Sequence, residues 1–256
     1  FTEILFFRDR ILPSLLLYYI SSQKTGNSSD RRYIMGEIFS YKEIRKSHEI
    51  NTLIEHGNEV LKTLGFTEHS RKHAAKVAET AGTILLKLGY SKHKAELAKT
   101  AGYMHDIGNS INRHDHAHSG ALLSYQILNK LNMPLSDILT VITAIGNHDE
   151  KTGSAVDPVS AALILADKTD VRRNRVQNPT PANFDIHDRV NYAALSSSLE
   201  LMKDKKVIQM NLELDDSICS VMDYFEIFLQ RMLMCKRASE VLGCKFKLVA
   251  NGHKLC

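Results

Sequence analysis

Apolar residues recur every three or four positions along most of the chain between residues 42 and 175, a spacing typical of amphipathic helices. The pattern predicts one helix that Thr67 caps at its start and Gly89 closes at its end. Its inner stripe consists of His73, Val77, Ala81, Ile84 or Leu85, and Leu88. The next helix is expected to begin near Lys92. Its inner stripe consists of Ala98, Ala101 or Gly102, and His105.

Further helices are expected downstream. One follows the HDHAH segment and is broken by Pro134. Its inner residues are Gly120, Ala121, Ser124, Leu128 and Leu131. The following stripe is formed by Ile138, Val141 or Ile142, Ile145 and His148. Asp157 before Pro158 predicts an N-cap with proline at the first helical position, and this helix carries Asp167.

The pattern changes after the Asn178–Pro181 segment. Residues 190–201 and 207–214 alternate in part and are joined by the charged run KDKK, which predicts a β-hairpin. A long amphipathic helix over about 216–242 and a strand in CKFKLVANG follow. The fold class expected is therefore mainly α, a helical bundle with a small C-terminal α+β unit.

This division predicts three segments. Residues 1–34 form an N-terminal extension and linker, residues 35–180 the helical domain, and residues 181–256 the α+β unit. The apolar run at 12–20 contains Pro13 and is shorter than the roughly 20 residues of a membrane helix. No small-residue cleavage site follows it, so neither a membrane segment nor a signal peptide is expected.

Composition narrows the class of protein. Apolar residues make up 43% and charged residues 24%, as in globular proteins. The net charge of +4 is too small to predict nucleic-acid binding. All four cysteines lie in the last quarter without C-x-x-C spacing, which indicates a reducing, cytoplasmic compartment.

Metal-binding side chains are concentrated in the helical region. Eight of the twelve histidines lie between His69 and His148. His73, His105, His148 and Asp167 each belong to the apolar stripe of a different expected helix, so packing would bury them together. A lone core histidine is usually a hydrogen-bonded packing residue, but several buried ionisable groups are costly unless they are paired or bind metal. The pattern therefore favours a metal site.

At this point the chain resembles the HD-domain superfamily of metal-dependent phosphohydrolases over roughly residues 66–176. The segments that carry the resemblance are HAAKVAETA, AGYMHDIGN, HAHSGA, AIGNHDE and LILADKTD. It implies the metal ligands His73, His105, Asp106, His116, His148 and Asp167. His69 is the alternative to His73, and Asp170 is disfavoured against Asp167.

The resemblance implies two divalent ions bridged by Asp106, with iron or manganese favoured and cobalt, nickel or zinc also suited to these ligands. A mononuclear site of His73, His105, Asp106 and Asp167 is the simpler alternative. A metal-activated hydroxide would attack the phosphorus of the substrate. Asp106 has a catalytic role because, as the bridging ligand, it would hold both ions. Lys168 and Arg172 follow Asp167 and are candidates to bind phosphoryl oxygens, although cations also suit a solvated helix end.

The substrate class is open in part. The segment from His116 to Asp167 is similar to HD-type diadenosine tetraphosphate hydrolases and lacks the Gly-Tyr-Pro signature of cyclic-dinucleotide phosphodiesterases. A small phosphorylated molecule, of nucleotide type, is therefore expected. The alternatives are a di-iron oxygenase of the HD fold and a non-catalytic binding module. Dimerisation through the C-terminal unit is expected because short sheets with exposed edges gain from pairing.

Another His-Asp segment lies outside the resemblance. Asp185, His187 and Asp188 stand in the linker to the small unit and have no partners of metal-ligand type nearby in the sequence. We expect them to cap a helix or to contribute to an interface.

Overall fold

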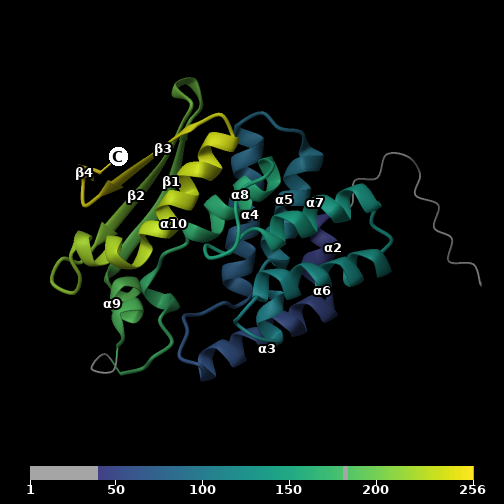
Figure 1. The fold of residues 1–256 in the computed structure, drawn as a ribbon, viewed down its shortest axis with the longest axis horizontal. Helices are drawn as coiled ribbons and strands as arrows, with labels where there is room; N and C mark the ends of the chain where they lie inside the picture. Colours follow the sequence, from purple (N-terminus) through teal and green to yellow (C-terminus); the bar gives the residue numbers. More distant parts are fainter. Residues whose placement is uncertain (1–39, 181–183, 256) are drawn as a thin grey trace, which may run out of the picture. The chain divides into compact units, whose positions relative to one another are not determined.

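A computed structural model describes residues 40–180 and 184–255 (Figure 1). These residues belong to one compact unit that spans 38–256. The expected extension at residues 1–34 lies outside the described residues. Within the described ranges, every helix is too short or too polar to cross a membrane.

The described elements confirm a mainly α fold with a small C-terminal α+β unit. The helical part contains α2 (Tyr41–Lys46), α3 (His48–Thr63), α4 (Arg71–Lys87), α5 (Lys92–Met104), the 3-10 helix η1 (Ile107–Ser110), α6 (His116–Lys130), α7 (Leu135–Gly146), α8 (Pro158–Lys168) and η2 (Arg173–Arg175). The C-terminal part contains α9 (Ile186–Ala193), β1 (Ala194–Met202), η4 (Lys203–Lys205), β2 (Val207–Leu214), α10 (Val221–Val241), β3 (Lys245–Ala250) and β4 (His253–Lys254).

Helix α8 lies at the centre of the helical part. Every residue from Val159 to Ala166 is buried, because α8 packs against α4, α5 and α7 and is covered by α10 from the C-terminal part. Asp157 accepts a hydrogen bond from the Ser160 backbone N–H, and Ser160 reciprocates as a capping box, as the Asp157–Pro158 pair predicts. The end of α8, which carries Asp167, is therefore held inside the protein.

The sheet has the order β1-β2-β3-β4. Strands β1 and β2 form the expected antiparallel hairpin, and β3 pairs with β2 in parallel. A parallel pair needs a crossover connection, and α10 supplies it. Figure 1 shows α10 beside the strands, and its packing partners include both β3 and α8. Helix α10 thus joins the small sheet to the helical core.

Three expected element starts are wrong. Helix α4 begins after Ser70, whose side chain accepts a hydrogen bond from the Lys72 backbone, and not after Thr67. Residues 190–193 continue a helix that Asp185 caps, so the first strand begins at Ala194. Helix α10 begins at Val221, because Ser220 and Asp223 form a capping box, and not near residue 216. In each case a capping side chain decides the boundary.

Gly108 is required for the close packing of η1 against α6. Helix α5 ends at Met104, and Gly108 lies inside η1, which packs against α6. A Cβ atom at position 108 would collide with the His116 carbonyl oxygen and would lie 2.6 Å from the Gly120 nitrogen. Backbone atoms of α6 cannot move aside as a flexible side chain can. The absence of a side chain therefore lets η1 and α6 meet.

We predict that Gly108→Ala destabilises the protein by about 2 kcal/mol or more, because η1 and α6 must separate. Urea unfolding of purified protein measures this change. Gly146→Ala is the matched control, since its Cβ would meet the Ala121 Cβ at 3.7 Å, an ordinary contact. A Gly108→Ala protein as stable as the Gly146→Ala protein would contradict the packing argument.

Candidate metal centre

Six side chains from five helices converge at one interior place, which we call the His-Asp cluster. Its members are His73, His105, Asp106, His116, His148 and Asp167. They come from α4, the ends of α5 and α8, the start of α6 and the turn after α7. The exposed fraction of their side chains lies between 1% for His73 and 12% for Asp167. Water therefore does little to stabilise these polar groups.

The Asp106 carboxylate lies in the middle of the cluster. Its Oδ2 is 3.0 Å from Nε2 of His105 and 3.8 Å from Nε2 of His73. Its Oδ1 is 3.5 Å from Nε2 of His116 and 3.8 Å from Nε2 of His148. The two oxygens of one carboxylate thus face two different pairs of imidazoles, which is the arrangement that a bridging ligand needs.

Asp167 completes one side of the cluster. Its Oδ1 is 3.4 Å from Nε2 of His73 and 3.6 Å from Nε2 of His105. We call His73, His105, Asp106 and Asp167 the first subsite. Asp106, His116 and His148 form the second subsite, in which the two Nε2 atoms are 3.2 Å apart.

In each of the four imidazoles, Nδ1 already has a hydrogen-bond partner outside the cluster. Nδ1 of His73 lies 2.8 Å from the Asp170 carboxylate. Nδ1 of His105 contacts the Gly102 carbonyl at 2.9 Å, and the corresponding atoms of His116 and His148 contact the carbonyls of Arg113 and Ile145. Carbonyl and carboxylate oxygens accept hydrogen bonds, so Nδ1 carries the proton and donates it. In the neutral ring, Nε2 then presents a lone pair toward the centre of the cluster.

These inward nitrogens fit metal ions. Among the described residues, the buried Nε2 atoms of His73 and His105 have no hydrogen-bond partner that meets normal geometry. A buried polar atom without a partner costs about 1–3 kcal/mol. The donor atoms of His73, His105 and Asp167 lie within 4.8 Å of one another, as do those of His105, Asp106 and His148. Divalent ions would satisfy these lone pairs and balance the buried carboxylates.

The charges of the cluster are strongly coupled. Burial raises the pKa of Asp106 and Asp167, but His105 beside Asp106 and Lys168 beside Asp167 outweigh it, so the pKa of both carboxyls stays well below its usual range. Burial together with the neighbouring His148 lowers the pKa of His116 to about 3. Both carboxylates are therefore ionised and His116 is neutral at pH 7, as metal binding requires. Burial lowers the pKa of His105, but Asp106 and Asp167 outweigh it and raise that pKa to about 10, so His105 must release a proton when a metal binds.

Asp170 contacts His73 on the side of the ring that faces away from the cluster. It contacts Nδ1 of His73 and is not a member of the His-Asp cluster. Its carboxylate accepts the Nδ1 hydrogen bond of His73 and pairs with Lys76 at 2.7 Å and with Arg172 at 2.8 Å. Arg175 donates to its backbone carbonyl. One buried carboxylate thus orients a candidate ligand and neutralises part of the surrounding positive charge.

Lys168 and Arg172, the expected phosphate-binding cations, are both paired with carboxylates. Nζ of Lys168 lies 2.7 Å from Asp167 and 2.9 Å from Glu150. Glu150 also pairs with Arg231 of α10 at 3.4 Å. Nε and Nη2 of Arg172 donate to the two oxygens of Asp170 at 2.8 and 2.9 Å. Their contact with phosphate stays a prediction.

Other histidines and acids lie farther from the centre or elsewhere. Nε2 of His69 is 3.9 Å from the Asp106 carboxylate, and its Nδ1 lies 2.6 Å from the Thr67 carbonyl. His69 therefore borders the His-Asp cluster beside His73. In the linker to the small unit, Asp185 caps α9 by accepting a hydrogen bond from the Asp188 backbone N–H. The capping role expected for that segment is confirmed.

Sequence reasoning missed the supporting residues. Asn109, which donates to Oδ1 of Asp106 at 2.9 Å, lies three residues after it, so helical spacing is a usable signal. Glu150 lies within the AIGNHDE segment. Arg231 lies in α10, and no local pattern connects it with Glu150.

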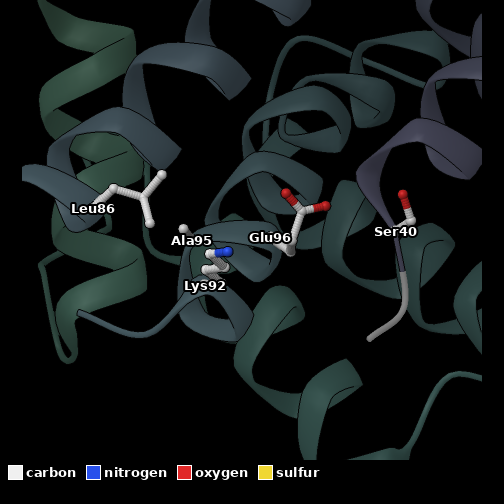
Figure 2. A pocket seen from close by; sticks show the side chains of 5 residues that line it. All are labelled: Ser40, Leu86, Lys92, Ala95 and Glu96. Atoms are coloured by element: carbon white, nitrogen blue, oxygen red, sulfur yellow. The ribbon is translucent and has the colours of Figure 1, made fainter. Parts of the chain in front are cut away.

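A separate hollow lies between α2, α4 and α5. Figure 2 shows the side chains that line it, which are Ser40, Leu86, Lys92, Ala95 and Glu96. Its volume is about 420 Å³. It shares no residue with the His-Asp cluster. Oε2 of Glu96 already accepts a hydrogen bond from the Tyr41 backbone N–H. Its lining contains no metal-ligand cluster, so the His-Asp cluster is the candidate functional site.

We predict that Asp170→Asn weakens metal binding about 10–100-fold, because His73 loses the carboxylate that orients it. The same change removes the negative charge that pairs with Lys76 and Arg172 and should lower the free energy of unfolding by about 2 kcal/mol. Metal titration and urea unfolding measure the two effects. Asp204→Asn, in the exposed turn η4, is the matched control and should change neither. Unchanged metal affinity in Asp170→Asn would refute its orienting role.

Comparison with known proteins agrees with this geometry. Residues 71–174 match the HD domain family, a range that contains all six members of the His-Asp cluster. The chain is also 24% identical over 232 residues to the uncharacterized protein MJ1020 of Methanocaldococcus jannaschii, and the alignment covers 81% of this chain and 82% of that protein. The chain is thus similar to the HD domain family over residues 71–174, the range in which the histidines and aspartates converge.

Proposed function

We propose that this protein is a metal-dependent phosphohydrolase that cleaves a phosphate ester or phosphoanhydride in a small, nucleotide-type substrate. The observation that carries the proposal is the buried Asp106 carboxylate, whose oxygens face two different pairs of imidazoles. The match to the HD domain family over 71–174 supports it, because the HD superfamily includes metal-dependent phosphohydrolases.

The donor set favours two divalent ions, one in each subsite of the His-Asp cluster. Imidazole and carboxylate ligands suit iron, manganese, cobalt, nickel and zinc, and we favour iron or manganese. When bound, such ions lower the pKa of water to about 7 and polarise a phosphoryl oxygen. Asp106 is shared by both subsites, so we assign it the central role in holding the reacting groups.

The protein's own residues keep the ligands in place. Lys168 neutralises Asp167 and Glu150, and Asp170 orients His73. Asn109 donates to Oδ1 of Asp106, which restricts the rotation of that carboxylate. Buried, paired groups of this kind hold their positions without rearranging during a reaction. Arg172 acts on the cluster through Asp170.

Two features outside the site extend the proposal. Cys219, Cys235 and Cys244 are buried and form no disulfide with one another, which fits a reducing, cytoplasmic environment. Strand β1 forms an edge of the sheet, and a homodimer through the C-terminal unit would cover it.

The decisive experiment joins metal analysis with a panel of phosphomonoesters, nucleotides and dinucleoside polyphosphates. We expect about two ions per chain and phosphate release from one class of substrate. Oxygen uptake by the reduced iron form without phosphate release would replace the hydrolase by the di-iron oxygenase alternative. Absence of bound metal would favour a non-catalytic binding module.

We predict that His148→Ala lowers the metal content toward one ion per chain and reduces hydrolysis by about 100-fold or more, because the second subsite loses an imidazole. Metal analysis and initial rates on the same preparation measure both effects. His118→Ala is the matched control, since His118 lies on α6 near His116 but is 58% exposed and pairs with Asp115. Unchanged metal content and activity in His148→Ala would eliminate the two-metal proposal.

A further inference from the structure

The cations around the His-Asp cluster differ in whether a carboxylate neutralises them. Those with a carboxylate partner within 4 Å are Lys76, Lys168, Arg172, Arg175 and Arg231. Arg113 lies just before α6 and contacts the cluster through His116. Of the acidic side chains that the structure describes, none lies within ion-pair distance of the Arg113 guanidinium. Its positive charge therefore remains available at the edge of the second subsite.

The donors of Arg113 are largely free. Nη1 lies 3.3 Å from the Asn109 side-chain oxygen and 3.4 Å from Nε2 of His116, both long contacts to uncharged groups. Within the described residues, Nε and Nη2 make no hydrogen bond. Nε2 of His116 cannot serve both Arg113 and a metal ion, so an ion in the second subsite would leave Nη1 with only its 3.3 Å contact to Asn109. A guanidinium with free N–H groups matches the oxygens of a phosphate in a two-point contact.

Phe66 holds this guanidinium without using its donors. The Arg113 Cζ atom lies 5.6 Å from the centre of the Phe66 ring. A cation over an aromatic ring is stabilised through its face, which leaves the N–H edge free for an anion. Phe66 is 42% exposed, so the pair lies at the protein surface, whereas His116 beside it is buried. Arg113 therefore spans the distance between solvent and the second subsite.

The backbone holds Arg113 and His116 in a defined relation. The Arg113 carbonyl accepts the Nδ1 hydrogen bond of His116 at 3.1 Å. Asp115, between them, has a φ of 56°, a left-handed conformation that non-glycine residues rarely adopt and that costs about 1 kcal/mol or more. This tight turn places the side chain of Arg113 against the inward nitrogen of the same histidine that its backbone orients.

We propose that Arg113 is the residue that binds the phosphoryl group of the substrate at the second subsite, with Phe66 positioning its guanidinium. The inference rests on the proposed phosphohydrolase function and names a residue for it. The ligand class is a tetrahedral oxyanion with at least two free oxygens, such as a phosphomonoester or the terminal phosphate of a nucleotide. Arg172 differs because its N–H groups already donate to Asp170.

Binding of inorganic phosphate to the metal-loaded protein tests the proposal without turnover. Isothermal titration would compare the unmodified protein with Arg113→Gln, Arg113→Lys, Phe66→Leu and the control Arg237→Gln, which removes an exposed charge from α10. We expect Arg113→Gln to weaken phosphate binding about 10-fold or more at unchanged metal content. Arg113→Lys should recover part of the loss, Phe66→Leu should cause a smaller one, and Arg237→Gln should cause none.

The outcomes separate this inference from the proposed function. Equal phosphate affinity in Arg113→Gln and the unmodified protein overturns the inference. It is also overturned if Arg113→Gln loses phosphate binding only because it loses its metal. No phosphate binding by the unmodified protein overturns it as well. Phosphate binding that depends on Arg113 in a protein that hydrolyses no substrate supports the anion site and refutes the phosphohydrolase. Hydrolysis whose KM is the same in the unmodified protein, Arg113→Lys and Arg113→Gln supports the phosphohydrolase and refutes the role of Arg113.

Discussion

The Asp106 carboxylate is the group on which the rest of the site depends. It lies between two pairs of imidazoles, and each of its oxygens faces one pair. A buried carboxylate is stable only where positive charge or hydrogen-bond donors surround it. The helical bundle satisfies this condition by bringing five helix ends to one place. The same requirement explains why the inward nitrogens of the histidines are aligned on a common centre and why divalent ions fit there.

The groups behind the cluster are as specific as the cluster itself. Asp170 joins His73 to nearby cations, and Lys168 joins Asp167 to Glu150. Through Glu150 and Arg231 this second series of ion pairs reaches α10, which also packs on the sheet. The C-terminal part is therefore in electrostatic contact with the candidate ligands. This gives the α+β unit a physical connection with the site beyond covering α8.

Local signals in the sequence were reliable where one side chain decides the outcome. The Asp157–Pro158 pair marks the start of α8 because the capping carboxylate and the proline act within one turn. Thr67 and Ser70 are both good capping residues, and the structure uses Ser70, whose side chain accepts the hydrogen bond from the Lys72 backbone N–H. The predicted first strand begins too early, because Val190 fits a strand or a helix equally well. Asp185 caps a helix that includes Val190.

The spacing of residues along the chain is enough to predict the helical class, the order of the main elements and the residue types of the candidate ligands, since each depends on a few turns of chain. Tertiary packing orients the imidazole of His73, because its Nδ1 contacts the distant Asp170, whereas Nδ1 of His105, His116 and His148 contacts a carbonyl three residues earlier in the chain. It also decided which cations are neutralised. Arg172 and Arg113 are equivalent as sequence letters, but the distance from each guanidinium to a carboxylate depends on how separate segments pack.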